Sequence, residues 1–166
     1  MALDIQKITR EQFASFLDTT PEASSETWGL IGVGITSYGI AFNPQVTTEK
    51  WIIHKAATSS LESYQRQGDV SQQCYKGDPI FEYINELRRT CGIGAKVQTS
   101  VLDVDMWDKT GNAYKATKSD AIIAITNYMA ENAVIEYTIY YNGDPVDGTV
   151  TMSVDGEPTF TAATSL

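Results

Sequence analysis

The chain has few of the residues from which catalytic and metal sites are built. Its 166 residues include a single histidine, His54, and two cysteines, Cys74 and Cys91. One histidine excludes a pair of histidine ligands for a metal, and it leaves no second histidine for a proton relay. Neither cysteine has the basic surroundings that lower a thiol pKa, so we expect both to be reduced and structural. The sequence therefore predicts no catalytic, cofactor-binding or metal-binding set, and we expect a protein that is not an enzyme.

Positive charge and long apolar runs are also scarce. Twelve Lys and Arg residues stand against 21 Asp and Glu residues, which gives a formal net charge of −9. A protein that grips nucleic-acid phosphates needs clustered basic residues, so this composition argues against that function. There is no apolar run of about 18 residues, and the N-terminal sequence MALDIQKITR lacks the apolar core of a signal peptide. We expect no membrane partner, and folding in a cytoplasm.

Asp103, Asp105 and Asp108 form a cluster of carboxylates that suggests calcium binding. The spacing of a calcium-binding EF-hand loop is not met, because Trp107 stands where a ligand belongs and no glutamate closes the loop. Alternation of apolar and polar residues instead places Asp103 and Asp105 on the water-exposed face of a strand. We therefore expect no metal site here.

The stretch from Gly77 to Arg89 predicts the one helix. Asp78 suits the N-cap position, and Pro79 suits the first helical position, where a missing N–H costs nothing. An apolar stripe follows at helical spacing: Ile80, Ile84 and Leu87. Gly92 is available as the C-terminal cap. A single amphipathic helix is thus expected to cover one side of a sheet.

Most of the remaining sequence predicts antiparallel strands. Strands are expected over residues 12–19, 97–107, 114–126, 134–141 and 149–154, with a last short edge strand after Pro158. Turn signals separate them at residues 109–112, 142–145 and 155–156. The expected fold is one domain over residues 1–166, mainly β with one α-helix, in an antiparallel sandwich or barrel.

Residues 47–75 predict a long protruding hairpin. Its first strand contains Trp51, and the chain is expected to turn around Ala56 to Ser60. The second strand, Leu61 to Tyr75, is polar on both faces, so burial gives it little stability in a monomer. Either this strand frays in the monomer or it pairs with another chain through main-chain hydrogen bonds.

Several stretches, in this order and spacing, resemble the major tail tube proteins of long-tailed phages. They are W-G-L-I-G-V-G-I-T-S (Trp28 to Ser37), N-P-Q-V-T-T-E-K-W-I (Asn43 to Ile52), S-Y…V-S-Q…Y-K-G-D-P-I-F-E-Y-I (Ser63 to Ile84), V-D-M-W-D (Val104 to Asp108) and Y-N-G-D-P-V-D-G-T (Tyr141 to Thr149). The resemblance covers nearly the whole chain. It is greatest to the proteins of phages and prophages of Gram-positive hosts.

This resemblance implies a β-sandwich or barrel with a flanking helix, assembled as hexameric rings that stack into a hollow tail tube. It implies a place in the virion tail after assembly in the host cytoplasm, with tape measure, tail terminator and baseplate or tail-tip proteins as further partners. DNA passes through such a lumen during ejection without specific binding, and a negative lumen would suit that passage. The expected inter-subunit contact residues are His54, Lys55, Ser59, Ser60, Glu62, Tyr64, Gln65, Arg66 and Gln67.

A binding module is the main alternative from another class. An immunoglobulin-like adhesion domain or a carbohydrate-binding domain would also have a β-rich pattern and many aromatic residues. The tyrosines that suit such a surface are Tyr64, Tyr128, Tyr137 and Tyr140. A hydrolase is disfavoured, because the sequence has no usable nucleophile or acid–base set.

Overall fold

The computed structural model of the chain describes residues 5–164. Within that range the protein is mainly β with a single α-helix, which confirms the expected class. The strands are β1 (Phe13–Asp18), β2 (Trp28–Leu30), β3 (Ile35–Ala41), β4 (Pro44–Glu49), β5 (Thr58–Tyr64), β6 (Gln67–Gln73), β7 (Gln98–Thr110), β8 (Ala113–Met129), β9 (Val134–Met152) and β10 (Pro158–Ala162). The helix is α1 (Pro79–Thr90), and short 3₁₀ turns span Arg10–Gln12 and Gly94–Val97.

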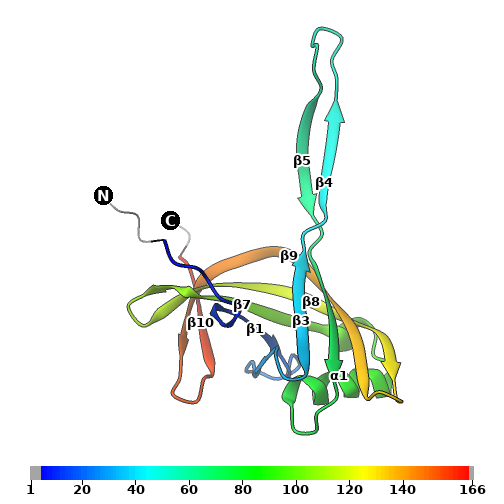
Figure 1. The fold of residues 1–166 in the computed structure, drawn as a ribbon, viewed down its shortest axis with the longest axis vertical. Coiled ribbons are helices and arrows are strands. Elements are labelled where there is room, and N and C mark those ends of the chain that lie inside the picture. The colour runs from blue at the N-terminus through cyan, green and yellow to red at the C-terminus, as the bar shows by residue number, and fades with distance from the viewer. Residues whose placement is uncertain (1–4, 165–166) are drawn as a thin grey trace.

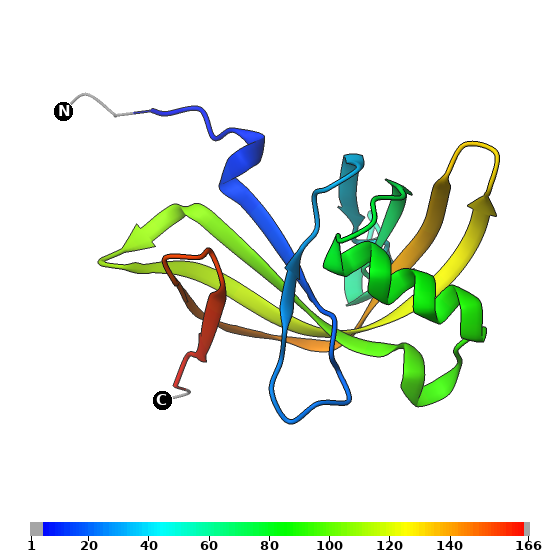
Figure 2. The ribbon, with the colours of Figure 1, turned by 90° about the horizontal axis from the view of Figure 1, so that it is seen from below.

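Eight of the strands form one antiparallel sheet that curls into a half-barrel (Figure 2). Along the sheet the order is β2-β1-β7-β8-β9-β6-β3, and β10 also pairs with β9. The long strand β9 pairs with β8 along one side. Its other side is shared, because β6 pairs with its first part and β10 with its last part. Strands β4 and β5 pair only with each other.

The sheet has an apolar cluster on each face. Val101 belongs to the cluster that α1 covers, whereas Leu102, the next residue of β7, belongs to a second cluster on the opposite face. The first cluster is the larger, and it contains the buried helix residues Ile80, Ile84 and Leu87. The second cluster includes Val150, and Trp28 and Phe160 pack against its edge. The half-barrel is therefore stabilised from both sides.

The helix begins as the sequence predicts. The Asp78 side chain accepts a hydrogen bond from the backbone N–H of Phe81 at 3.0 Å, and Pro79 is the first helical residue. Its C-terminal end differs from the expectation at one position. The left-handed residue is Cys91, with φ of 47°, and Gly92 follows it and donates its N–H to the Leu87 carbonyl at 3.1 Å. Gly92 is therefore not the cap residue that was expected.

The turn expected at residues 142–145 is wrong. Strand β9 runs through this stretch, which forms a bulge against β8: Asn142 lies opposite Asp120, and Val146 lies opposite Lys118. Gly143 adopts φ of 63° inside the bulge. Residues 142–145 therefore form a bulge within one long strand and not a turn, because β8 pairs with β9 on both sides of them.

The expected strand from Leu61 to Tyr75 is in fact two strands. The chain breaks at residues 65–66, so the projecting hairpin spans residues 44–64, not 47–75. Beyond the break, β6 enters the main sheet between β3 and β9. Val70 and Gln72 of β6 are buried. The prediction that this second part lacks burial in the monomer was therefore wrong for β6.

Candidate functional site: a projecting hairpin and its root

The β4–β5 hairpin projects away from the rest of the molecule (Figure 1). Every residue of both strands is exposed. The strands pair from Pro44 with Tyr64 to Glu49 with Thr58. A single two-stranded hairpin is only marginally stable in water, because it has no apolar face to bury. This hairpin is therefore the part of the structure that gains most from contact with a partner.

The tip of the hairpin, residues 50–57, is apolar and basic. Trp51, Ile52 and Ile53 have relative exposures of 62%, 104% and 82%. The Trp51 and His54 rings are stacked with their centroids 5.9 Å apart. The backbone N–H of His54 also donates to the backbone carbonyl of Trp51 at 3.0 Å. Lys50 precedes this group, Lys55 follows it, and the tip contains no acidic residue. Exposed apolar groups gathered in this way mark an interaction surface.

The structure places the expected contact residues in three places: the tip of the hairpin, strand β5, and the root that follows β5. His54 and Lys55 lie in the tip, and Gln65, Arg66 and Gln67 lie at the root. Exposed residues of β5 make up the rest: Ser59, Ser60, Glu62 and Tyr64. Arg66 and Gln67 are half-buried against their own chain, so they are less suited to a partner than the exposed residues.

Sequence reasoning missed the tip as a unit. Trp51 was expected in the first strand of the hairpin, but β4 ends at Glu49 and Trp51 lies in the turn. Ser59 and Ser60 were expected at the turn, and they lie in β5. The available signal was the run of large apolar residues between Lys50 and Lys55, which alternates too little for a half-buried strand.

At its root, the hairpin joins the sheet through two short segments. The Gln65 N–H donates to the Phe42 carbonyl at 3.1 Å, and the Asn43 side-chain amide donates to the Gln65 carbonyl at 3.0 Å. Asn43 has φ of 44°, a conformation that asparagine tolerates better than most residues. The Phe42 and Tyr64 rings meet edge to face at 5.6 Å. These contacts hold the two segments to each other.

A partly buried polar cluster lies next to the root. The Tyr38 and Tyr141 hydroxyls are 2.8 Å apart, and the Ser15 hydroxyl donates to the Asp103 carboxylate at 2.5 Å. Arg66 lies with its guanidinium 4.8 Å from the centre of the Tyr141 ring. A cavity of about 480 Å³ is lined by Tyr38, Arg66 and Asp103, among other residues. The root is therefore joined to a hydrogen-bonded network inside the curled sheet.

Asp103 does not lie on a water-exposed face as expected. Burial raises the pKa of its carboxyl group, while the hydroxyls of Ser15 and Tyr141 and the Arg66 guanidinium favour the charged form. The neighbouring charge of Asp105 opposes that charged form. Burial also raises the pKa values of Tyr38 and Tyr141, so both hydroxyls stay protonated and can donate hydrogen bonds at neutral pH. Alternation predicted correctly that Asp103 lies on the side of β7 opposite to Leu102 and Val104, but its prediction that this side faces water was wrong.

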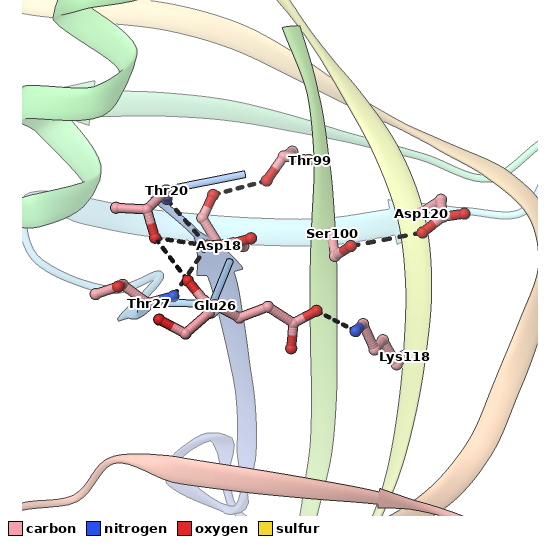
Figure 3. Close-up of polar contacts among 9 residues, drawn as sticks. Asp18, Thr20, Glu26, Thr27, Thr99, Ser100, Lys118 and Asp120 are labelled. Atoms are coloured by element: carbon pink, nitrogen blue, oxygen red, sulfur yellow. Dashed lines mark hydrogen bonds and ion pairs between the residues drawn. The ribbon is translucent and has the colours of Figure 1, made fainter. Parts of the chain in front are cut away.

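A second, more polar cavity of about 760 Å³ lies beside the loop between β1 and β2. Figure 3 shows the polar contacts around Asp18, Glu26 and Lys118 at this place. Asp18 accepts hydrogen bonds from the backbone N–H groups of Thr20 and Thr27, each at 3.0 Å. Glu26 forms an ion pair with Lys118 of β8. These acidic groups are thus engaged in holding the loop against the sheet. Among residues 5–164 no group of three or more His, Cys, Asp or Glu residues is placed to hold a metal ion.

Comparison of the sequence with protein families and with curated proteins finds no match. No helix in residues 5–164 is long and apolar enough to cross a membrane. Function therefore has to be inferred from the chain itself. Its most distinctive features are the exposed hairpin, the basic apolar tip and the polar network at the root.

The burial of Asp103 predicts a pH effect on stability. Because the pKa of Asp103 is raised in the folded protein, the fold binds its proton more readily than the unfolded chain does. This contribution to stability is complete below the unfolded pKa of about 3.9, and it is lost as the pH rises through the raised pKa. We expect wild-type stability to fall more steeply above about pH 4 than that of Asp103→Asn. Urea unfolding from pH 4 to 8 measures the difference.

The exposed Asp155→Asn substitution is the control for that comparison, because it removes a carboxyl group without removing a buried one. Its stability should follow the wild-type pH profile. Arg66, Asp105 and Tyr141 face Asp103 and are unchanged in both variants. Parallel profiles for wild type and Asp103→Asn would show that Asp103 titrates as an ordinary surface carboxyl group.

Proposed function

We propose that this protein is a structural subunit of a phage tail tube, without enzymatic activity. Its copies form hexameric rings, and the rings stack into the hollow tube through which DNA passes during ejection. The observation that carries this proposal is the β4–β5 hairpin, which is exposed along its whole length and ends in a basic, apolar tip. Such an element gains stability from a partner, and a neighbouring copy is the partner that the tail tube resemblance suggests.

The open edges of the half-barrel support self-assembly. Strands β2 and β3 stand at the two ends of the sheet order, and β10 pairs only with β9. Unpaired strand edges present free N–H and C=O groups, which invite pairing with another chain. Closing a barrel from several copies would remove these edges. The tail tube fold is part of the proposal, and the open half-barrel is compatible with it.

The charge distribution supports contact between copies. After Lys118 the sequence contains no Lys, Arg or His, and its acidic residues there are Asp120, Glu131, Glu136, Asp144, Asp147, Asp155 and Glu157. The basic tip of one copy is therefore attracted to the acidic part of another. The net charge of −9 also disfavours binding of DNA phosphates, which suits a lumen that DNA must traverse.

The proposal includes a cellular setting and further partners. The subunit is made in the host cytoplasm and resides in the virion tail. Tape measure, tail terminator and baseplate or tail-tip proteins contact the ends or the interior of the tube. These partners follow from the tail tube resemblance, and the exposed hairpin supplies the means for contact between the copies themselves.

Electron microscopy of the purified protein tests the proposal. Tubes, or rings with six-fold symmetry, are the expected result. A persistent monomer that binds members of a glycan array would overturn the proposal and favour the carbohydrate-binding alternative. Mapping the electrostatic potential of an assembled ring tests the lumen separately, and a strongly positive lumen would contradict the proposed passage of DNA.

Reversing the charge of the tip is expected to weaken assembly without unfolding the subunit. In Lys50→Glu/Lys55→Glu the tip becomes acidic, like the surface it is proposed to meet, so attraction turns into repulsion. We expect the protein concentration needed for tube formation to rise by about tenfold, which corresponds to about 1.4 kcal/mol. Light scattering across a concentration series measures it.

The variant Lys76→Glu/Lys96→Glu makes the same change of net charge at exposed sites outside the hairpin. It should assemble at nearly the wild-type concentration. Equal effects of the two double variants would mean that net charge, and not the tip, controls assembly. Assembly of the wild type should also weaken with added salt, because exposed charges are screened.

A further inference from the structure

Arg66 is the residue at which the hairpin meets the rest of the sheet. Its carbonyl accepts a hydrogen bond from the Tyr141 N–H at 3.0 Å. Its guanidinium donates to the Ser119 hydroxyl at 3.0 Å, and it lies 4.8 Å from the centre of the Tyr141 ring. Arg66 therefore contacts β9 through its backbone carbonyl and the Tyr141 ring, and it contacts β8 through its guanidinium. The planar guanidinium of an arginine can stack on an aromatic ring and donate hydrogen bonds at the same time. It therefore restricts the orientation of its partners more than the flexible ammonium group of a lysine does.

Tyr141 is itself held from the other side of the curled sheet. Its hydroxyl lies 2.8 Å from the hydroxyl of Tyr38 on β3, which is an end strand of the sheet. The same hydroxyl stabilises the charged form of Asp103 on β7, and Asp103 accepts a hydrogen bond from Ser15 on β1 at 2.5 Å. Strands far apart in the sheet order are therefore connected across its interior through Tyr141.

The other contacts at the root do not orient the hairpin relative to the sheet. The hydrogen bonds from Gln65 to Phe42 and from Asn43 to Gln65 join the two segments of the root to each other. Strands β4 and β5 are exposed throughout, so they add no packing against the sheet. Apart from the continuous backbone, the contacts of Arg66 with Tyr141 and Ser119 are therefore the interactions at the root that can fix the direction of the hairpin relative to the sheet.

We propose that Arg66 and Tyr141 are positioning residues that set the direction of the hairpin relative to the sheet. The Tyr38 hydroxyl, which lies 2.8 Å from the Tyr141 hydroxyl, holds Tyr141 in place. The consequence of this fixed direction for assembly rests on the proposed function. A hairpin that already points at its neighbour loses less conformational entropy when it docks. Loosening the joint should therefore hinder assembly while the whole exposed hairpin, residues 44–64, is kept.

A distance measurement in the free subunit tests the joint directly. Spin labels are placed on Ile52→Cys in the tip and Glu86→Cys on the exposed face of α1, in a background that lacks Cys74 and Cys91. Pulsed electron paramagnetic resonance then gives the distribution of tip-to-helix distances. We expect one narrow distribution for the wild-type joint and a markedly broader one for Arg66→Ala. Tyr141→Phe keeps the ring under Arg66 but removes the hydroxyl, so it should broaden the distribution less.

Tyr128→Phe removes a hydroxyl from an exposed tyrosine outside the joint and serves as the control. Its distance distribution should match that of the wild type. A thermal unfolding midpoint close to that of the wild type shows that broadening reports direction, and not loss of the fold. If Arg66→Ala does not fold, Tyr141→Phe decides. An unchanged distribution in the folded variants would overturn the proposal.

The same variants separate this inference from the proposed function. If Arg66→Ala has a broader distribution of tip-to-helix distances, we expect it to form tubes only at a protein concentration about tenfold higher than the wild type needs. If the wild type forms no tubes at all, the tail tube proposal fails, but the distance distributions still decide whether Arg66 and Tyr141 position the hairpin. If tubes form equally well with a broad distribution, the joint orients the hairpin but does not assist assembly, which overturns its proposed consequence.

Discussion

Replacing residues 44–64 with an Asn-Gly turn is expected to give a folded monomer that forms no tubes. Strands β4 and β5 pair only with each other and bury no residue against the sheet, so their removal costs the fold little. A two-residue Asn-Gly turn suits the antiparallel strands β3 and β6, which it would join. We expect the free energy of unfolding to change by less than about 1 kcal/mol, as for surface changes away from the core. Assembly, in contrast, should be lost completely.

Urea unfolding, size-exclusion chromatography and electron microscopy measure the two halves of this expectation. A matched variant, Trp51→Ser/Ile52→Ser/Ile53→Ser, keeps the full length of the hairpin and changes only the apolar part of its tip. If it also fails to assemble, the tip makes the decisive contact; if it assembles, the strands of the hairpin do. Tubes formed by the truncated protein would contradict the role given to the hairpin.

The helix could be predicted from sequence because its signals are local. Asp78 and Pro79 define its start within two adjacent positions, and the apolar stripe from Ile80 to Leu87 needs only the helical period. Strands β7 and β8 were likewise expected, because apolar and polar residues alternate along parts of both segments. Each of these elements is specified by residues near one another in the chain.

The missed features depend on residues distant in sequence. The bulge in β9 required knowing that β8 continues on both sides of residues 143–145. The place of Asp103 in a partly buried network required Tyr141 and Ser15, which come from other strands. Turn chemistry and alternation give the local preference, and the tertiary partner decides whether the preference is kept. The contact candidates at the root were affected in the same way, since Arg66 binds its own sheet.

Gln72 of strand β6 is the clearest case of a residue whose burial depends on partners distant in sequence. The sequence of β6, QGDVSQQ, is polar at most positions, and polarity was taken to mean exposure. In the structure Gln72 is 0% exposed and its amide is fully engaged. Its nitrogen donates to the Asp78 carboxylate at 2.7 Å and to the Val33 carbonyl at 3.1 Å, and its oxygen accepts from the Tyr137 hydroxyl at 3.2 Å. A buried polar residue is stable when all its groups have partners, and here the partners come from three other parts of the chain.

Replacing Gln72 with Leu is therefore expected to lower the free energy of unfolding by about 2–4 kcal/mol. Leucine is close in size, so the loss comes from the hydrogen bonds and not from a large cavity. The change leaves the buried Asp78 carboxylate and Tyr137 hydroxyl without this partner, and unpaired buried polar groups are costly. Urea unfolding measures the effect. Because Asp78 also caps α1, hydrogen exchange should rise first in the helix.

Gln98→Leu is the matched control, since it makes the same chemical change at an exposed residue. It should alter the free energy of unfolding by no more than about 0.5 kcal/mol. Tyr137→Phe removes one of the hydrogen bonds to Gln72 and should cost about 1 kcal/mol. The three variants then rank by how many buried groups lose a partner. A Gln72→Leu protein as stable as the wild type would show that β6 is held by its ladder and by Val70, and that the amide merely fills space.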